Sequence, residues 1–410
     1  MDTGSISWGI VATALVLVMT PGVAFFYGGL VKAKSVISMM MMSFGALGLV
    51  SVLWILYGYN MTSVEGVWSF AGNPFTDFGL SGMSGGETAN TDLLGVAYGS
   101  TFAIITIALI SGAIADRAKF GSWMLFVGLF ATLAYFPIAA WVWGGGWIMN
   151  LGTTLFGEDA GIEVIDYAGG TVVHLNAGAA ALALALVLGK RVGFQKGILK
   201  PHNVPLTMLG ASILWFGWFG FNAGAEWLNG LENVGLIVIN TIGATAAAII
   251  GWLVVEKLKD GKATSVGAAS GAVAGLVAIT PACANLAPGW ALLLGIITGA
   301  LCALAVELKF KFGFDDSLDV VGIHLVGGLI GTVFLGFFAT GTGLVLGGGV
   351  QQLIVQVIPV LAVMIYSFVV AWVIGTLIQK TIGFRITNED ELAGVDTTVH
   401  GEEGYALDRV

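Results

Sequence analysis

Charged side chains are scarce in this sequence. Asp, Glu, Lys and Arg make up 10% of the 410 residues, whereas soluble domains contain about 25%. Hydrophobic residues reach 57%, and the mean hydropathy is +0.92. A soluble protein needs a charged outer surface, so this scarcity excludes a soluble globular fold and requires many apolar side chains to face lipid.

Other absences bear on function. The sequence has two cysteines, Cys283 and Cys302, which lie in apolar stretches without a companion His. We therefore expect buried thiols, with no metal site and no cofactor. Neither the Thr-Val-Gly-Tyr-Gly filter of potassium channels nor the paired Asn-Pro-Ala loops of water channels is present. These absences argue against both of those channel classes.

Long apolar segments are what the sequence does contain. A membrane-spanning helix needs about 20 mostly apolar residues. The segments are continuously apolar rather than alternating, which favours helices over a β-barrel. The sequence therefore predicts an all-α integral membrane protein with eleven transmembrane helices, near residues 5–30, 36–59, 93–114, 120–143, 167–188, 204–223, 234–255, 266–284, 289–308, 320–340 and 350–379.

The basic residues predict the orientation, because Lys and Arg collect in cytoplasmic loops. If the N-terminus is outside, all 16 basic residues fall on the inside: Lys32, Lys34, Arg117, Lys119, Lys190, Arg191, Lys196, Lys200, Lys257, Lys259, Lys262, Lys309, Lys311, Lys380, Arg385 and Arg409. We therefore predict a multi-pass protein of the cell (inner) membrane, with the N-terminus outside and the C-terminus in the cytoplasm.

The outside loops then carry acidic residues and no basic ones: Glu65, Asp77, Glu87, Asp92, Glu158, Asp159, Glu163, Asp166, Glu226 and Glu232. Such a face concentrates cations and repels anions, which argues against an anionic substrate or a nucleic-acid partner. The same distribution also follows from the bias of basic residues toward the inside alone.

Two histidines stand out within the spans. His174 follows Asp166 by eight residues in the fifth segment, and His324 follows Asp319 by five residues in the tenth. Helices 1–5 and 6–10 form two sets of five, so the sets have opposite orientations and predict an inverted repeat followed by one extra helix. At about 1.5 Å per residue, the two side chains would approach each other near the centre of the membrane.

The histidines allow two interpretations. A lone His in a helix bundle often only packs, but ionisable residues inside a membrane are rare and usually functional. The spans hold no carboxylate except Glu256 and Glu307 at cytoplasmic helix ends, beside Lys257 and Lys309. A metal site would need such ligands. The pattern instead predicts an apolar pore in which two imidazoles form a polar track for a small neutral solute.

Aromatic residues cluster toward the outer ends of helices. Trp143 precedes three glycines, Tyr98 and Phe102 lie four residues apart on one helix face, and Phe221 lies near the end of the sixth segment. Aromatic rings can hold a cation by about 0.5–2 kcal/mol. Trp and Tyr also collect at membrane interfaces for no other reason, and composition alone favours that second interpretation.

Several motifs resemble the signature of the ammonium transporter family (Amt/Mep/Rh), and its bacterial and archaeal Amt branch in particular. They extend from the first helix to the tail: TPGVAFFYGG at 20–29, DYAGGTVVHLNAG at 166–178, KPHN at 200–203, GWFGFNAG at 217–224, GLVAITPAC at 275–283, DVVGIH at 319–324 and HGEEGY at 400–405. The resemblance covers essentially the whole chain.

The resemblance implies roles for matching positions. Trp143, Phe102, Tyr98 and Asp166 would form or organise an outer site that recruits ammonium or methylammonium, and Phe102 and Phe221 would stack as a gate below it. His174 and His324 would be the paired histidines of the pore, and Ser270 would line it. The family further implies a homotrimer and a PII-type signal protein at the cytoplasmic face.

One position departs from the family pattern. The outer site usually has a Ser after the Phe-Asn-Ala-Gly run, and here Ala225 stands there. A hydroxyl acceptor for an ammonium N–H group is lost, so the site is either weaker or completed by a nearby carbonyl or by Glu226. This departure bears on affinity rather than on the overall function.

We hypothesise that residues 1–379 form a channel domain that recruits ammonium, deprotonates it and conducts ammonia past the two histidines. Residues 380–410 would form a cytoplasmic regulatory tail; a disordered end is the simpler alternative. A second hypothesis is an ammonium receptor with little flux. An intramembrane enzyme is disfavoured because the sequence offers no nucleophile–base pair.

Overall fold

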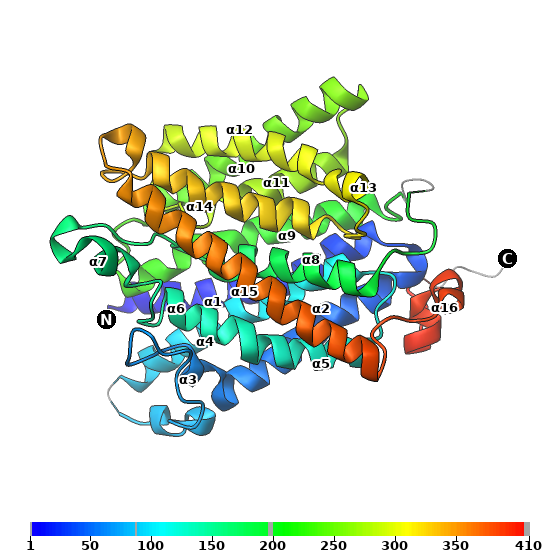
Figure 1. Cartoon of the computed structure of the whole chain (residues 1–410), viewed down its shortest axis with the longest axis horizontal. Helices are drawn as coiled ribbons and strands as arrows, with labels where there is room; N and C mark the ends of the chain where they lie inside the picture. The colour runs from blue at the N-terminus through cyan, green and yellow to red at the C-terminus, as the bar shows by residue number, and fades with distance from the viewer. Residues whose placement is uncertain (1, 87, 196–199, 406–410) are drawn as a thin grey trace.

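The computed structural model describes residues 2–86, 88–195 and 200–405. Within these ranges the chain is helical apart from turns and one isolated bridge between Ala118 and Arg385. Figure 1 shows the long helices lying side by side, with the N-terminus at one end of the bundle and α16 (Asn388–Ala393) at the other. We call these two ends the N-terminal face and the C-terminal face.

Within the described ranges, eleven helical segments cross the bundle. They are α1 (Thr3–Leu30), α2 (Val36–Leu53) continued by α3 (Tyr59–Met61), α4 (Ala89–Ile110), α5 (Phe120–Phe130) with α6 (Phe136–Val142), α8 (Asn176–Leu188), α9 (Val204–Ala223), α10 (Val234–Asp260), α11 (Ser265–Ile279), α12 (Pro288–Ala305), α14 (Val326–Phe338) and α15 (Gln351–Thr381). Two short helices, α7 (Leu151–Phe156) and α13 (Leu308–Phe312), lie in connections.

Ten of these crossings, in the part of the chain that the structure describes, are long and apolar enough to span a membrane. The eleventh, α11, is shorter: it ends at Ile279, so the prediction of a helix over 266–284 was wrong at its end. Pro281 has no N–H to continue the helical ladder. Large apolar side chains in mid-helix, such as Phe216, Ile250 and Ile365, are at least 60% exposed. The chain is therefore an all-helical, multi-pass membrane protein, as predicted.

The two halves of the bundle are inverted relative to each other. On α1, Gly29 lies against Thr207, and Gly22 and Phe26 lie near Gly210, so α1 and α9 run antiparallel. The turn preceding α8 packs on α14, and the turn preceding α14 packs on α8. Helices α1 and α9 are the first spans of the two sets of five, and α8 and α14 are the last.

The fifth and tenth spans approach closely at a glycine. A Cβ atom on Gly178 would lie 2.4 Å from the backbone nitrogen of Leu325. Any side chain at this position would push the two spans apart, because real Cβ atoms do not approach backbone so closely. The glycine therefore permits the short separation between the segments that carry His174 and His324.

The C-terminal face carries the basic residues, and several loops meet there through a buried ionic cluster. Arg191 forms a bidentate ion pair with Asp315 at 2.9 Å and a second ion pair with Asp116 at 3.0 Å. Arg117 is fully buried and donates to the Ser317 hydroxyl and the Asp315 carbonyl. Glu87, Lys196 and Arg409 lie outside the described residues.

The tail packs on the C-terminal face as far as the structure describes it. The carboxylate of Asp396 accepts hydrogen bonds from the backbone N–H groups of Ile37 and Ser38 at the start of α2. The Tyr405 hydroxyl lies 2.7 Å from Nε2 of His202, whose Nδ1 lies 2.8 Å from the Val31 carbonyl. Residues 380–405 are therefore docked on the loops of this face.

Candidate functional site

A cavity of about 460 Å³ opens at the N-terminal face. We call it the vestibule. Its walls are largely aromatic and come from four of the spans and from the segment before α8: Trp54, Tyr59, Tyr98, Phe102, Tyr135, Trp143, Tyr167 and Phe221, with the methyl group of Ala225 among them. The structure thus brings together four of the predicted aromatic residues, which are far apart in the sequence, around one hollow.

Trp143 is the most exposed of the predicted aromatics, at 36%. Its indole Nε1 donates a hydrogen bond to the backbone carbonyl of Asp166 at 2.9 Å. Its ring stands perpendicular to that of Phe102, with centroids 6.0 Å apart. Because the indole N–H is already satisfied, Trp143 presents its ring rather than its polar atom to the vestibule.

Asp166 shapes the site through the backbone. Its carboxylate accepts hydrogen bonds from the N–H groups of Gly169, Gly170 and Thr171, and from the Thr171 hydroxyl. It thereby caps the helical turn that carries His174. Gly169 adopts φ +114°, a conformation that favours glycine. Asp166 is 6% exposed and does not line the vestibule, so it positions the site rather than contacting a solute there.

Two phenylalanines close the floor of the vestibule. The rings of Phe102 and Phe221 stack with centroids 4.3 Å apart and an interplanar angle of 24°. Phe221 is fully buried, and its ring lies 6.0 Å from the imidazole of His174 on the far side. Any solute that leaves the vestibule toward the histidines must therefore displace or pass these rings.

The two histidines meet below the floor. Nδ1 of His174 lies 3.2 Å from Nδ1 of His324, and the rings lie 5.3 Å apart at 26°. Each residue lies in a π-helical turn, at Gly170–Leu175 and at Val321–Leu325. Such turns occur frequently at functional sites. The inverted repeat thus places one imidazole from each half at the same point.

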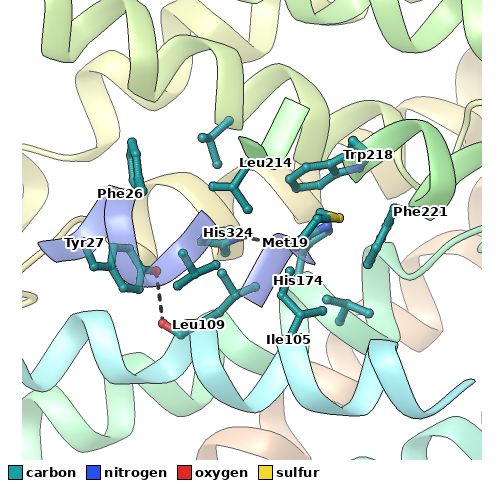
Figure 2. A pocket seen from close by; sticks show the side chains of 13 residues that line it. Met19, Phe26, Tyr27, Ile105, Leu109, His174, Leu214, Trp218, Phe221 and His324 are labelled. Carbon is teal, nitrogen blue, oxygen red and sulfur yellow. Dashed lines mark hydrogen bonds between the residues drawn. The ribbon is translucent and has the colours of Figure 1, made fainter. Parts of the chain in front are cut away.

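A small central cavity adjoins the pair (Figure 2). It holds about 10 Å³ and is lined by Met19, Val23, Phe26, Tyr27, Ile105, Leu109, Val173, His174, Leu214, Trp218, Phe221, Val273 and His324. This volume admits about one water-sized molecule. Apart from the imidazoles, the lining is almost entirely apolar. Phe221 lies on one side of the histidines in Figure 2, and Phe26 and Tyr27 lie on the other.

The chemistry of the histidine pair follows from its geometry. A hydrogen bond between two Nδ1 atoms requires one of them to donate and the other to accept. On the ring whose Nδ1 donates, Nε2 is then an acceptor, and on the ring whose Nδ1 accepts, Nε2 is a donor. Nε2 of His174 is buried and has no partner among the described residues. The pair can therefore offer hydrogen-bonding groups of either kind to a small neutral molecule beside it.

A third cavity lies toward the C-terminal face. Leu30, one turn beyond Tyr27 on α1, lines a hollow of about 190 Å³ together with Asp116, Arg191, Lys309 and Asp319. The Tyr27 hydroxyl donates to the Leu109 carbonyl at 3.1 Å, which holds its ring at the end of the central cavity. An aromatic hollow at the N-terminal face, a hollow with charged walls at the C-terminal face and a narrow, mostly apolar cavity between them form the outline of a pore.

The structure also shows what the sequence reasoning missed. Trp218 stacks on His174 with centroids 5.6 Å apart, and its indole donates to the Thr280 hydroxyl. It lies three residues before Phe221 on α9, a helical spacing that could have identified it.

Ser270 is buried on α11, one turn before Val273, and does not line the central cavity. Glu226 is fully buried and reaches the vestibule only through Tyr167.

The chain is similar in sequence and fold to known proteins. A sequence model of the Ammonium Transporter Family matches residues 7–405. An ammonium transporter of Mycobacterium tuberculosis is 49% identical, with 98% of this chain and 90% of that protein aligned. A solved structure described as a Sensor Amt Protein has a TM-score of 0.87 at 27% identity, covering 97% of this chain and 98% of that one.

The crystal structure of Saccharomyces cerevisiae Mep2 has a TM-score of 0.81 at 32% identity, covering 95% of this chain and 91% of that one. The matched family is one of transporters and not of enzymes. The match extends over nearly the whole chain, including both halves of the inverted repeat and both histidines. The chain therefore belongs to the ammonium transporter family.

Proposed function

We propose that this protein takes up ammonium at its N-terminal face and conducts it across the membrane as ammonia. One observation supports the proposal above all. The path between the two hollows narrows to a cavity of about 10 Å³ whose lining is apolar except for the His174–His324 pair and for the polar atoms of Tyr27 and Trp218, which are bonded to the protein. That cavity has no room for a hydration shell and no carboxylate to replace one, so a permanent cation is strongly disfavoured there.

The steps follow from the order of the residues. Ammonium gathers at the acidic N-terminal face and is held in the vestibule by the rings of Trp143, Phe102 and Tyr98. It gives up its proton at or below the Phe102–Phe221 stack, and the proton either returns to water in the vestibule or follows the ammonia along the histidine pair. Ammonia then passes the two imidazoles by hydrogen bonding. Potassium is rejected because it has no proton to release.

Orientation and assembly are also part of the proposal. The basic loops of the C-terminal face favour a cytoplasmic location for that face, in a cell (inner) membrane, with the N-terminus outside. Residues 1–379 form the transport domain, and residues 380–410 form a regulatory tail. The family resemblance supports a homotrimer that serves nitrogen uptake, with a PII-type signal protein binding to the cytoplasmic face.

Reconstitution tests the proposed function. Purified protein in liposomes is expected to take up ammonium at least about ten times faster than protein-free liposomes, because the vestibule and the imidazoles lower the cost of entering an apolar passage. Uptake is measured with an ammonium gradient, and the current on an ammonium pulse is recorded in the same preparation. A current shows that one positive charge crosses with the ammonia, as it would if the released proton followed; its absence shows that transport is electroneutral. Uptake equal to that of protein-free liposomes, by protein that remains folded, contradicts transport.

A second candidate is an ammonium sensor with little flux. The structural similarity to a protein described as a Sensor Amt Protein favours it, and so does the missing hydroxyl at Ala225. Calorimetry on the detergent-solubilised protein separates the two functions. Ammonium binding without uptake would support the sensor, whereas binding together with uptake supports the transporter.

A further inference from the structure

Apart from the hydroxyls of Tyr59, Thr62 and Ser63, the vestibule lining has few polar atoms that could accept a hydrogen bond from ammonium. The indole N–H of Trp143 is a donor only, and it is already bonded to the Asp166 carbonyl. The Tyr98 hydroxyl is buried and donates to the carbonyls of Gly220 and Phe221. Ala225 contributes a methyl group to the wall. The aromatic rings can attract a cation, but they do not fix the direction of its N–H bonds.

Tyr167 is, like Tyr59, a partly buried tyrosine that lines the vestibule. Its hydroxyl donates a hydrogen bond to the carboxylate of Glu226, the residue that follows Ala225. Its backbone N–H is bonded to the Pro281 carbonyl at 3.2 Å, which fixes the chain at this point. Because its single proton is committed to Glu226, the phenol oxygen can serve a ligand in the vestibule only as an acceptor.

Glu226 is a carboxylate without a counter-ion. It is fully buried, and its second oxygen accepts from the backbone N–H of Asn233 at 2.8 Å. Among the residues that the structure describes, no Lys, Arg or His lies within ion-pair distance of it. A buried charge that lacks a partner is costly, so a cation placed nearby would be favoured strongly.

We propose that Tyr167 and Glu226 together form the hydrogen-bonding part of the ammonium site, at the position where Ala225 supplies none. The phenol oxygen accepts one ammonium N–H, and Glu226 behind it supplies the negative charge without entering the vestibule. This proposal rests on the proposed function, and it identifies the class of ligand more narrowly: a compact cation that carries N–H groups, such as ammonium or methylammonium. A quaternary ammonium ion has no N–H and cannot use the acceptor.

Three variants test the pair in the liposome assay. Tyr167→Phe removes the hydroxyl and keeps the ring, and Glu226→Gln removes the charge and keeps the shape. Each is expected to raise the half-saturating ammonium concentration about tenfold, the usual order for a lost charge-assisted hydrogen bond. The maximal rate should change less than about twofold, because the floor and the histidines are untouched. Tyr57→Phe is the matched control, since it removes a hydroxyl bonded to Thr132 away from the vestibule.

A rescue experiment separates a binding role from a merely structural one. Ala225→Ser places a hydroxyl in the vestibule wall, so adding it to Tyr167→Phe is expected to recover most of the lost affinity. Restored affinity supports the proposal. Wild-type affinity in Tyr167→Phe, or a defect that Ala225→Ser does not relieve, overturns it. Absence of uptake by the wild-type protein would instead overturn the proposed function, so the two failures are distinguishable.

Discussion

Replacing both pore histidines, by His174→Ala together with His324→Ala, is expected to lower ammonium uptake about 100-fold. The central cavity is otherwise almost entirely apolar, so the variant leaves ammonia there without imidazole partners. An unsatisfied polar group in such an environment costs about 3 kcal/mol, which corresponds to about two orders of magnitude in rate. Uptake into proteoliposomes at saturating ammonium measures the effect.

The double variant needs a control for folding and for histidine chemistry elsewhere. His400→Ala removes an imidazole that packs on Phe120 at the C-terminal face, and uptake should remain within about twofold of the wild type. Thermal unfolding of both variants checks that the bundle remains intact. Unchanged uptake by a folded double variant would show that the imidazoles are packing residues only, and the ammonia pathway described here would be wrong.

Arg191→Met is expected to lower the free energy of unfolding by about 3–5 kcal/mol. The carboxylates of Asp116 and Asp315 are 2% and 0% exposed. Removing the guanidinium leaves both of them without this cation, and breaking a buried ion pair in this way typically costs about 3–5 kcal/mol. Lys259→Met is the matched control. Its ion pair with Glu307 is 39% and 47% exposed, and exposed pairs contribute at most about 1 kcal/mol. Chemical or thermal unfolding in detergent measures both.

The destabilisation should depend on pH with a definite sign. Burial acts to raise the pKa of Asp315, but the ion pair with Arg191 outweighs it and holds the pKa below the ordinary value of 3.8. The ion pair between Arg191 and Asp315 therefore adds to the free energy of unfolding at pH values above 3.8. This stabilisation is lost as the pH falls through the lowered pKa of Asp315. The deficit of Arg191→Met should be largest near neutral pH and should shrink on acidification. Equal destabilisation by Lys259→Met, or a deficit that grows on acidification, would contradict this account of the cluster.

The architecture could be predicted because it depends on properties that a sequence records directly. The length of apolar segments fixes the number of crossings, and the partition of basic residues fixes their alternation. Opposite directions of the fifth and tenth spans then place His174 and His324 at one level. The predicted end at 284 was wrong because residues 280–284 are apolar like a helix but form a turn in which Asn240 bonds to the Cys283 carbonyl. The span predicted near 234–255 stopped short of the charged last turn of α10, which ends at Asp260.

The details of the site could not be predicted because they depend on contacts between distant segments. Tyr167 and Glu226 are 59 residues apart and meet only after the first and second halves of the bundle have packed. Trp218 could be assigned to the histidines only once α9 was placed beside them. The ionic cluster joins three loops, and the sequence indicated only that Arg117 and Arg191 were basic.

The family match assigns the chain to transporters, and the geometry of the histidine pair explains how such a chain could select its solute. Phe102 and Phe221 separate the vestibule from the central cavity, and the residues that line the central cavity include no carboxylate. A solute that keeps its charge meets an apolar barrier at this point. A solute that loses a proton meets two imidazoles suited to a neutral hydrogen-bonding molecule.

The flux of potassium relative to that of ammonium, in the same proteoliposomes and under the same gradient, tests this claim most directly. The two cations are similar in size and charge, and only ammonium can release a proton. We expect ammonium uptake well above that of protein-free liposomes and potassium flux no greater than that of protein-free liposomes. Potassium flux comparable to ammonium uptake would show that an intact cation crosses the narrow segment, and it would contradict the account.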